Sequence, residues 1–250
     1  MGMFDFLFDK EKAKTRQIEK LRKKLTNIWV QSPDRYLAAE QLRDLNDDEA
    51  WRAMLDRFKT QVKNTTYDTQ EKLDMCDMFV TQGGARVIPV VQGYIRANTN
   101  HINFPMRILD DLMPSNDMAE FLTTLLSEMD IEYERDPEKK EQLILRAEKF
   151  KDFDELKEQV ARFVADDNET IRFLAVNQVL NHSEDPWDSL RVNLRFEDSG
   201  RILNLVCERF RDTDQCALEN LEDQDAREDL TERLPNEYFL TEEGFIRPKV

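Results

Sequence analysis

The chain contains little glycine, proline, cysteine and histidine for its length. Six glycines and eight prolines among 250 residues are fewer than a protein rich in tight turns requires, so we do not expect a β-rich architecture. The three cysteines form no Cys-x-x-Cys motif and no cysteine–histidine set, which argues against a metal ribbon. We interpret them as reduced thiols of a cytoplasmic protein.

Long apolar runs are also absent. No apolar stretch approaches the roughly 20 residues that a membrane-spanning helix needs. The apolar residues between 3 and 8 form a short run that Asp5 interrupts, and no basic region precedes it. We therefore expect neither a signal peptide nor stable insertion into a membrane.

The net charge is strongly negative, at −16, with 52 acidic and 36 basic residues. A field of this sign repels nucleic acid and anionic membranes unless a local basic patch overrides it. We therefore do not expect a nucleic-acid partner. The acidic surface favours solubility and would suit a basic protein partner.

Sequence motifs for catalysis or cofactor binding are missing as well. There is no HExxH, GxSxG, phosphate-binding loop or dinucleotide motif. The only two histidines, His101 and His182, each lie beside an asparagine, where a surface turn is expected. Paired acids fall mostly at helix ends, where the helix dipole accounts for them. We predict no catalytic, cofactor-binding or metal-binding residues, and we do not expect an enzyme.

A helix, a short polar turn and a second helix are predicted for residues 168–196, and this pattern recurs. Two octets match in register: Arg35-Tyr-Leu-Ala-Ala-Glu-Gln-Leu and Arg172-Phe-Leu-Ala-Val-Asn-Gln-Val. Each octet is followed by an acidic turn, a tryptophan (Trp51 or Trp187) and an Arg-Phe pair. The octets begin 137 residues apart, which is four steps of roughly 34 residues, a period typical of helix-pair solenoids.

Polar residues or proline suited to helix starts recur at a similar interval. They are spaced 34, 35, 34, 31 and 30 residues apart, at Asp34, Asp68, Asn103, Pro137, Asn168 and Asp198. This regularity predicts about six helix pairs in a single solenoid over residues 33–224. The highly charged residues 130–141 are expected to form a protruding, mobile connection.

The octets give the chain a resemblance to the HEAT-repeat family. Residues 34–58 and 168–196 show a polar cap, an apolar residue plus arginine, small alanines and then leucine. This pattern resembles the short bacterial HEAT-like repeats that also occur in phycobilisome lyase subunits. The resemblance implies an all-α, right-handed α-solenoid, armadillo-like in form, whose second helices line a concave binding face. It says little about function, because solenoids have many functions.

Both ends of the chain differ from the repeats. Residues 1–32 are predicted to form a basic amphipathic capping helix, with an apolar stripe at Ile18, Leu21, Leu25 and Ile28. Between residues 10 and 24, eight basic and two acidic residues give a net charge of +6. The alternative for residues 3–24 is weak peripheral contact with a membrane.

The last residues, 225–250, are predicted to form a cap that includes a short β-hairpin. Two apolar runs, at residues 238–240 and 245–246, flank a glycine-containing turn. The acidic residues between 219 and 232 form either a solvated helix or a docking face for a basic partner.

We predict protein binding through polar side chains on the expected concave face. The candidate residues are Arg52, Arg57, Gln92, Arg96, Arg162, Arg191 and Arg195. A strip of arginines framed by acidic surface would favour a peptide that carries carboxylates. The alternative is that these arginines pair with turn acids of neighbouring repeats.

The predicted function is a non-catalytic scaffold or adaptor that binds a protein of unknown identity. One alternative is a small-molecule or chromophore-binding protein with lyase-like activity, and another is a HEAT-type DNA glycosylase. A deep apolar groove with aromatic walls would favour the small-molecule-binding hypothesis, whereas a shallow polar groove would favour the adaptor hypothesis. The negative charge runs against the glycosylase, which needs a basic groove.

Overall fold

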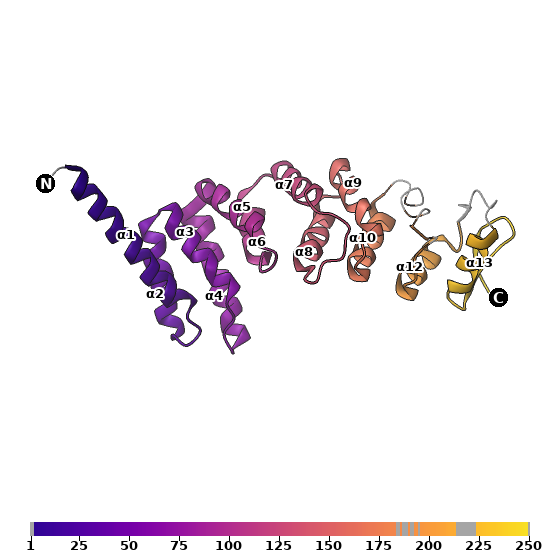
Figure 1. The fold of residues 1–250 in the computed structure, drawn as a ribbon, viewed down its shortest axis with the longest axis horizontal. Helices are drawn as coiled ribbons and strands as arrows, with labels where there is room; N and C mark the ends of the chain where they lie inside the picture. The colour runs from indigo at the N-terminus through magenta and orange to yellow at the C-terminus, as the bar shows by residue number, and fades with distance from the viewer. Residues whose placement is uncertain are drawn as a thin grey trace. The chain divides into compact units, whose positions relative to one another are not determined.

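The computed structural model describes residues 3–183, 186, 190, 193, 194, 196–213 and 224–249. It is mostly helical, with a small two-stranded antiparallel sheet near the C-terminus (Figure 1). The chain divides into two compact units, Met1–Met118 (unit 1) and Ala119–Val250 (unit 2). The expected helical class with a terminal hairpin is confirmed. Each unit is described by itself.

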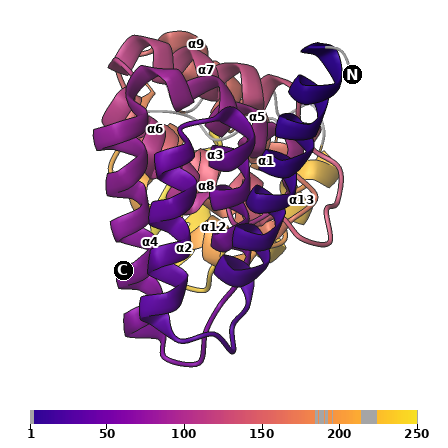
Figure 2. The same ribbon diagram turned by 90° about the vertical axis from the view of Figure 1, so that its left-hand side faces the viewer.

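Unit 1 contains the first six α-helices, the start of the seventh and three short helical turns. They are α1 (Met3–Thr26), α2 (Ser32–Leu45), α3 (Asp48–Leu55), η1 (Asp56–Lys59), α4 (Thr65–Met78), the π-helical η2 (Phe79–Gly83), η3 (Gly84–Val87), α5 (Ile88–Ala97), α6 (Asn103–Leu112) and the start of α7 (Ser115–Ser127). α1 packs on α2 and α3, α2 packs on α3 and α4, and α4 packs on α6 (Figure 2).

Side-chain caps begin two of these helices, α3 and α4. Asp47 accepts a hydrogen bond from the Glu49 amide of α3 at 2.8 Å, and Asn64 accepts one from the Tyr67 amide of α4 at 3.2 Å. The prediction that Asp68 caps the second repeat is wrong. Asp68 lies inside the first turn of α4, where its side chain is buried by ion pairs.

The core of unit 1 is aromatic and aliphatic. The Trp51 and Phe79 rings lie 4.8 Å apart between centroids, and Phe58 stacks on Phe104 at 5.5 Å. Such ring pairs stabilise a core beyond their area burial. Ile28, predicted as the end of the α1 stripe, is 43 % exposed, because α1 already ends at Thr26.

Unit 2 holds the remaining elements. They are the end of α7, α8 (Glu138–Ala147), η4 (Glu148–Phe150), α9 (Asp154–Arg162), η5 (Phe163–Ala165), α10 (Glu169–His182), α12 (Gly200–Phe210), α13 (Gln224–Arg233), β1 (Tyr238–Leu240) and β2 (Ile246–Pro248). β1 and β2 pair antiparallel, with Phe239 opposite Arg247. The Arg247 guanidinium donates to the Thr213 carbonyl at 2.9 Å, which ties the hairpin to the end of α12.

Asn168 caps α10 as predicted, accepting from the Thr170 amide at 2.9 Å. Asp198, predicted to begin the next repeat, lies one residue before the true cap. Ser199 caps α12 by accepting from the Ile202 amide at 3.4 Å.

One contact recurs between successive helices of unit 2. Lys140 of α8 binds Asp166 at 3.0 Å, and Arg172 of α10 binds Glu197 at 3.0 Å. Each acid lies two residues before a helix cap and accepts the amide of that cap residue, at 2.8 and 2.9 Å respectively. A cation on α8 therefore fixes the start of α10, and a cation on α10 fixes the start of α12.

The charged connection before α8 folds back on unit 2. The Asp167 amide donates to the Ile131 carbonyl at 2.9 Å, and the Tyr133 amide donates to the Asp167 carboxylate at 3.2 Å. Lys140 donates to the Glu132 carbonyl at 3.3 Å. Residues 131–133 therefore do not protrude freely as expected, because two of these bonds join them to Asp167 before α10 and the third joins them to α8.

Candidate functional site

Arg57, one of the predicted binding residues, is fully buried. Its Nε donates to Glu71 at 2.8 Å, its Nη2 donates to Asp68 at 2.5 Å, and its Nη1 donates to the Thr60 carbonyl at 2.9 Å. Its exposed fraction is 0 %. The prediction that Arg57 lines a binding face is wrong, because its side chain is buried. It pairs with acids as the alternative supposed, but Asp68 and Glu71 lie within α4 and not in a turn.

The other predicted residues have varied surroundings. In unit 1, Arg52 and Arg96 are exposed, and the Gln92 amide lies 3.7 Å from the Met113 sulfur. In unit 2, Arg162 is exposed and donates to the Met129 carbonyl at 3.1 Å. Among the described residues, unit 1 therefore exposes two of the predicted binding arginines, and unit 2 exposes one.

Two of the predicted binding residues, Arg191 and Arg195, lie outside the described residues, and so does Trp187.

A buried ion cluster surrounds Arg57. It joins three cations to two carboxylates and consists of Arg35, Arg57, Asp68, Glu71 and Lys72. The Arg35–Glu71 and Lys72–Asp68 pairs both measure 2.7 Å. Each of the five residues is at most 7 % exposed. Buried charges of this kind persist only when they are paired and hydrogen-bonded.

The cluster keeps both of its carboxylates ionised. Burial opposes ionisation of Asp68, but hydrogen bonds from Lys72 and Arg57 outweigh it and lower the pKa of Asp68. Burial opposes ionisation of Glu71 too, and hydrogen bonds from Arg35 and Arg57 lower the pKa of Glu71 in the same way. Opposite charges within a few ångströms have this effect in proteins.

The cluster also fixes the turn between α1 and α2. The Arg35 Nη1 donates to the Val30 carbonyl, and the Ser32 hydroxyl donates to Glu71 at 3.1 Å. Within the turn, the Trp29 amide donates to the Asn27 side chain at 2.9 Å. The backbone on both sides of Trp29 is therefore hydrogen-bonded, and one of these bonds leads to the buried cluster.

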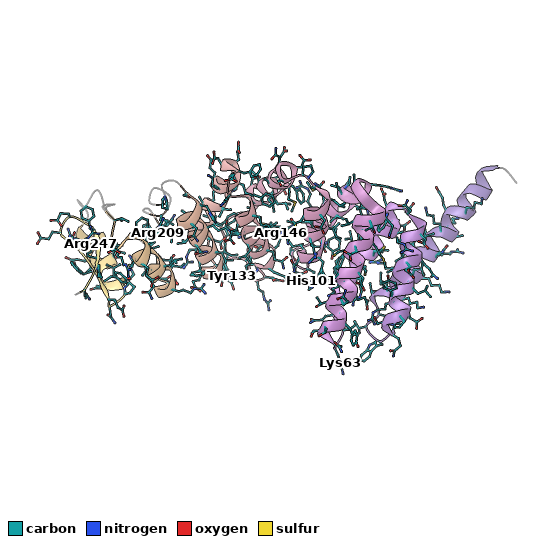
Figure 3. The ribbon with its side chains drawn as sticks, turned by 180° about the vertical axis from the view of Figure 1, so that it is seen from behind. Lys63, His101, Tyr133, Arg146, Arg209 and Arg247 are labelled. Carbon is teal, nitrogen blue, oxygen red and sulfur yellow. The ribbon has the colours of Figure 1, made fainter. Side chains whose placement is uncertain are left out.

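This fixed turn exposes large apolar side chains. Trp29 is 78 % exposed and Ile28 is 43 % exposed. Tyr67, in the first turn of α4 at the same end of unit 1, is 66 % exposed. Figure 2 shows the turn before α2 and the loop before α4 at one end of the unit, and Figure 3 marks that end with Lys63.

We define the aromatic end surface by the exposed side chains at this end of unit 1, which are Ile28, Trp29 and Tyr67. Tyr36 and Leu37 of α2 are exposed as well. Sequence reasoning missed this surface because it assigned Ile28 to the buried stripe and gave Trp29 no role. The available signal was an Ile-Trp-Val run in a polar segment directly before Pro33.

Unit 2 has an open cleft of about 720 Å³ between the turns that precede α10 and α12. Its lining is mainly charged and comprises Val164, Ala165, Asp166, Asp167, Glu169, Arg172, Asn193, Phe196, Glu197, Asp198 and Ser199. Several of these charges have partners: Arg172 binds Glu197, and Glu169 binds Arg201 at 3.3 Å. Phe196 is 78 % exposed.

A second cavity, of about 10 Å³, lies beside the end of α10. It has room for about one water molecule. His182 lines it, and among the described residues no group hydrogen-bonds the buried Nε2 of this histidine. The prediction that His182 lies in a surface turn is wrong. His182 is the last residue of α10 and is partly buried.

The described cysteines have the environment of inert thiols. Burial raises the pKa of Cys76 and of Cys207 to about 12. In the part of the chain that the structure describes, no group of three or more His, Cys, Asp or Glu residues could hold a metal ion. No helix there is both long enough and apolar enough to cross a membrane.

Comparison with known proteins adds no relative. No family model matches the sequence, and no match is found among curated proteins or solved structures. The similarity to HEAT repeats therefore stays a prediction from the octets.

Proposed function

We propose that this protein is a non-catalytic scaffold or adaptor that binds a protein partner through the aromatic end surface of unit 1. The observation that carries the proposal is Trp29, which is 78 % exposed on a turn that hydrogen bonds from its own amide and from the buried Arg35 hold in place. An exposed tryptophan costs solubility, and apolar side chains clustered at one end of a unit are typical of interaction sites.

The physics of interfaces supports this choice of site. Tryptophan is among the residues that most often dominate binding energy. Its side chain buries about 150–250 Å², which at about 25 cal/mol per Å² corresponds to about 4–6 kcal/mol of favourable transfer free energy. Because the turn is already ordered, little of this gain is lost to ordering the backbone.

The cavities of unit 2 favour the adaptor over a small-molecule carrier. The larger cleft is open and lined mainly by charged side chains, and the smaller cavity accommodates about one water molecule. The larger cleft lacks the apolar walls that a chromophore needs, and the smaller cavity, which Phe150, Leu156 and Val160 help to line, is too small to hold one. The net charge of −16 disfavours the glycosylase alternative.

We also propose that the helix pairs follow the HEAT-like pattern, about six of them in a right-handed solenoid, in a cytoplasmic protein. The equivalent contacts of the two octet arginines support this assignment. Arg35 donates to the Val30 carbonyl and to Glu71, and Arg172 donates to the Asp166 carbonyl and to Glu197. In both octets the arginine links the turn before its own helix to an acid of the next pair. An experimental structure of the full chain tests the handedness.

The experiment for the function compares two exposed apolar positions. Tagged full-length protein, Trp29→Ala and Leu145→Ala are used to capture proteins from the lysate of the source cells, with mass-spectrometric quantification. Leu145 is the control because it is 51 % exposed on α8 of unit 2. We expect one specific protein to be depleted with Trp29→Ala and retained with Leu145→Ala. Identical captured sets for both variants would contradict the proposal.

A further inference from the structure

The helix α1 divides its basic residues between two faces. On the packed side, Lys14 binds Asp47 at 2.5 Å, Arg22 binds Asp56 at 2.7 Å and Lys24 binds Asp34 at 2.9 Å. These pairs join α1 to the ends of α2 and α3. They account for three of the eight basic residues between positions 10 and 24.

A second set of cations faces away from the unit. Lys12, Arg16 and Lys20 are exposed, and none of them has an ion pair with a described residue. Their spacing of four residues places them along one side of the helix. We call these three residues the basic stripe. Like charges at this spacing destabilise a helix by about 0.2–0.5 kcal/mol per pair, and among the described side chains no ion pair offsets that repulsion.

The stripe lies on an accessible part of the molecule. Figures 1 and 3 show the first turns of α1 extending past the other helices of unit 1. From Lys12 to Lys20 the helix rises about 12 Å, so a partner helix of two to three turns would cover the stripe. The stripe ends about two turns before the turn that exposes Trp29.

The chemistry of the stripe selects the kind of partner. A helix that inserts into a membrane surface needs an apolar face turned to the lipid. Ile18, Leu21 and Leu25 are at most 7 % exposed, so this apolar face is occupied by α2 and α3. Two copies of the chain each carry −16 and repel one another. A local row of carboxylates on another protein complements the stripe directly.

We infer that the basic stripe of α1 docks an acidic helical segment of a protein partner, with carboxylates at four-residue intervals facing Lys12, Arg16 and Lys20. The inference rests on the proposed protein-binding function and extends its surface from Trp29 along α1. Such a contact steers the partner and sets its orientation, while the tryptophan supplies apolar affinity.

The test uses a synthetic helical peptide of about 20 residues with glutamate at every fourth position, and a glutamine version as its control. Binding to the full-length protein is measured by fluorescence anisotropy at about 50 mM and about 300 mM salt. The stripe is altered by the charge reversal Lys12→Glu, Arg16→Glu, Lys20→Glu. The conservative swap Lys12→Arg, Arg16→Lys, Lys20→Arg keeps the charge, and circular dichroism checks that both variants are folded.

We expect the glutamate peptide to bind the wild type and the conservative variant, to lose about tenfold or more in affinity with the charge reversal, and to weaken at the higher salt. The glutamine peptide should not bind. Equal binding to the charge-reversed protein would overturn the inference. So would binding of phosphatidylserine vesicles without the peptide, or formation of a dimer that blocks the peptide.

The two proposals fail separately. The peptide lacks an apolar anchor, so Trp29→Ala should leave its affinity unchanged. Identical captured sets for Trp29→Ala and Leu145→Ala would contradict the proposed function alone, and equal peptide binding by the wild type and the charge-reversed protein would contradict the inference alone.

Discussion

Replacement of Arg57 by methionine removes a guanidinium from the buried ion cluster and keeps most of its apolar stem. In the wild type this group contacts Glu71, Asp68 and the Thr60 carbonyl. After the substitution both carboxylates lose a charged donor in a site that is closed to water. Removing one partner of a buried pair costs about 3–5 kcal/mol, because the other charge is left uncompensated.

We expect Arg57→Met to lower the free energy of unfolding of unit 1 by about 3–5 kcal/mol. Two features set this range. Arg35 and Lys72 still neutralise part of the charge on the carboxylates, which limits the loss. The exposed fraction of Arg57 is 0 %, so solvent cannot replace the missing donor.

The assay is urea unfolding followed by the fluorescence of Trp51. This residue is fully buried in the core of unit 1, beside Phe79. The chain has three tryptophans, so Trp29→Phe and Trp187→Phe in the background leave Trp51 as the sole reporter.

Arg52→Met is the matched control for Arg57→Met. Arg52 lies on α3 and is exposed, so its replacement should change stability by less than about 0.5 kcal/mol. Adding Glu71→Gln to Arg57→Met should cost less than the sum of the two single changes, because they share one network. Similar stabilities for Arg57→Met and Arg52→Met would refute the reasoning.

The remaining predictions concern acid stability, unit 2 and thiol reactivity. The lowered pKa values of Asp68 and Glu71 supply stability that is present above their ordinary values of 3.8 and 4.5 and is lost as the pH falls through the folded pKa values. An acid titration of the Trp51 signal should thus show unfolding, while a pH-independent signal would contradict it. Arg172→Met should destabilise unit 2 by about 2 kcal/mol and speed amide exchange at the start of α12, and unchanged exchange would count against the contact. Cys76 and Cys207, whose pKa burial raises to about 12, should resist Ellman's reagent at about pH 8 until urea is added, and prompt labelling of either would contradict their burial.

Local signals in the sequence identified much of the helical organisation. Asn168 caps a helix because its side chain reaches an amide two residues away, and such a contact depends on adjacent residues alone. The hairpin at residues 238–248 followed from two apolar runs and a glycine turn.

Contacts between distant segments could not be predicted from the sequence. Arg57 reads as an exposed residue of a second helix, but its partners lie 11 and 14 residues away on the following helix. Asp68 lies on this following helix, α4, and its buried side chain pairs with Arg57 and Lys72. Trp29 is exposed only because α1 ends at Thr26, and helix ends are the least certain part of a pattern.

The proposed function depends most on Trp29 as the centre of a protein-docking surface. The most direct measurement places a photo-crosslinking benzoylphenylalanine at position 29 in the full-length protein, irradiates it in the source cells and identifies the adduct by mass spectrometry. The same residue at position 145 of unit 2 is the control. We predict a discrete protein adduct from position 29 that position 145 does not give. Equal labelling from both positions, or no protein adduct from position 29, would contradict the account.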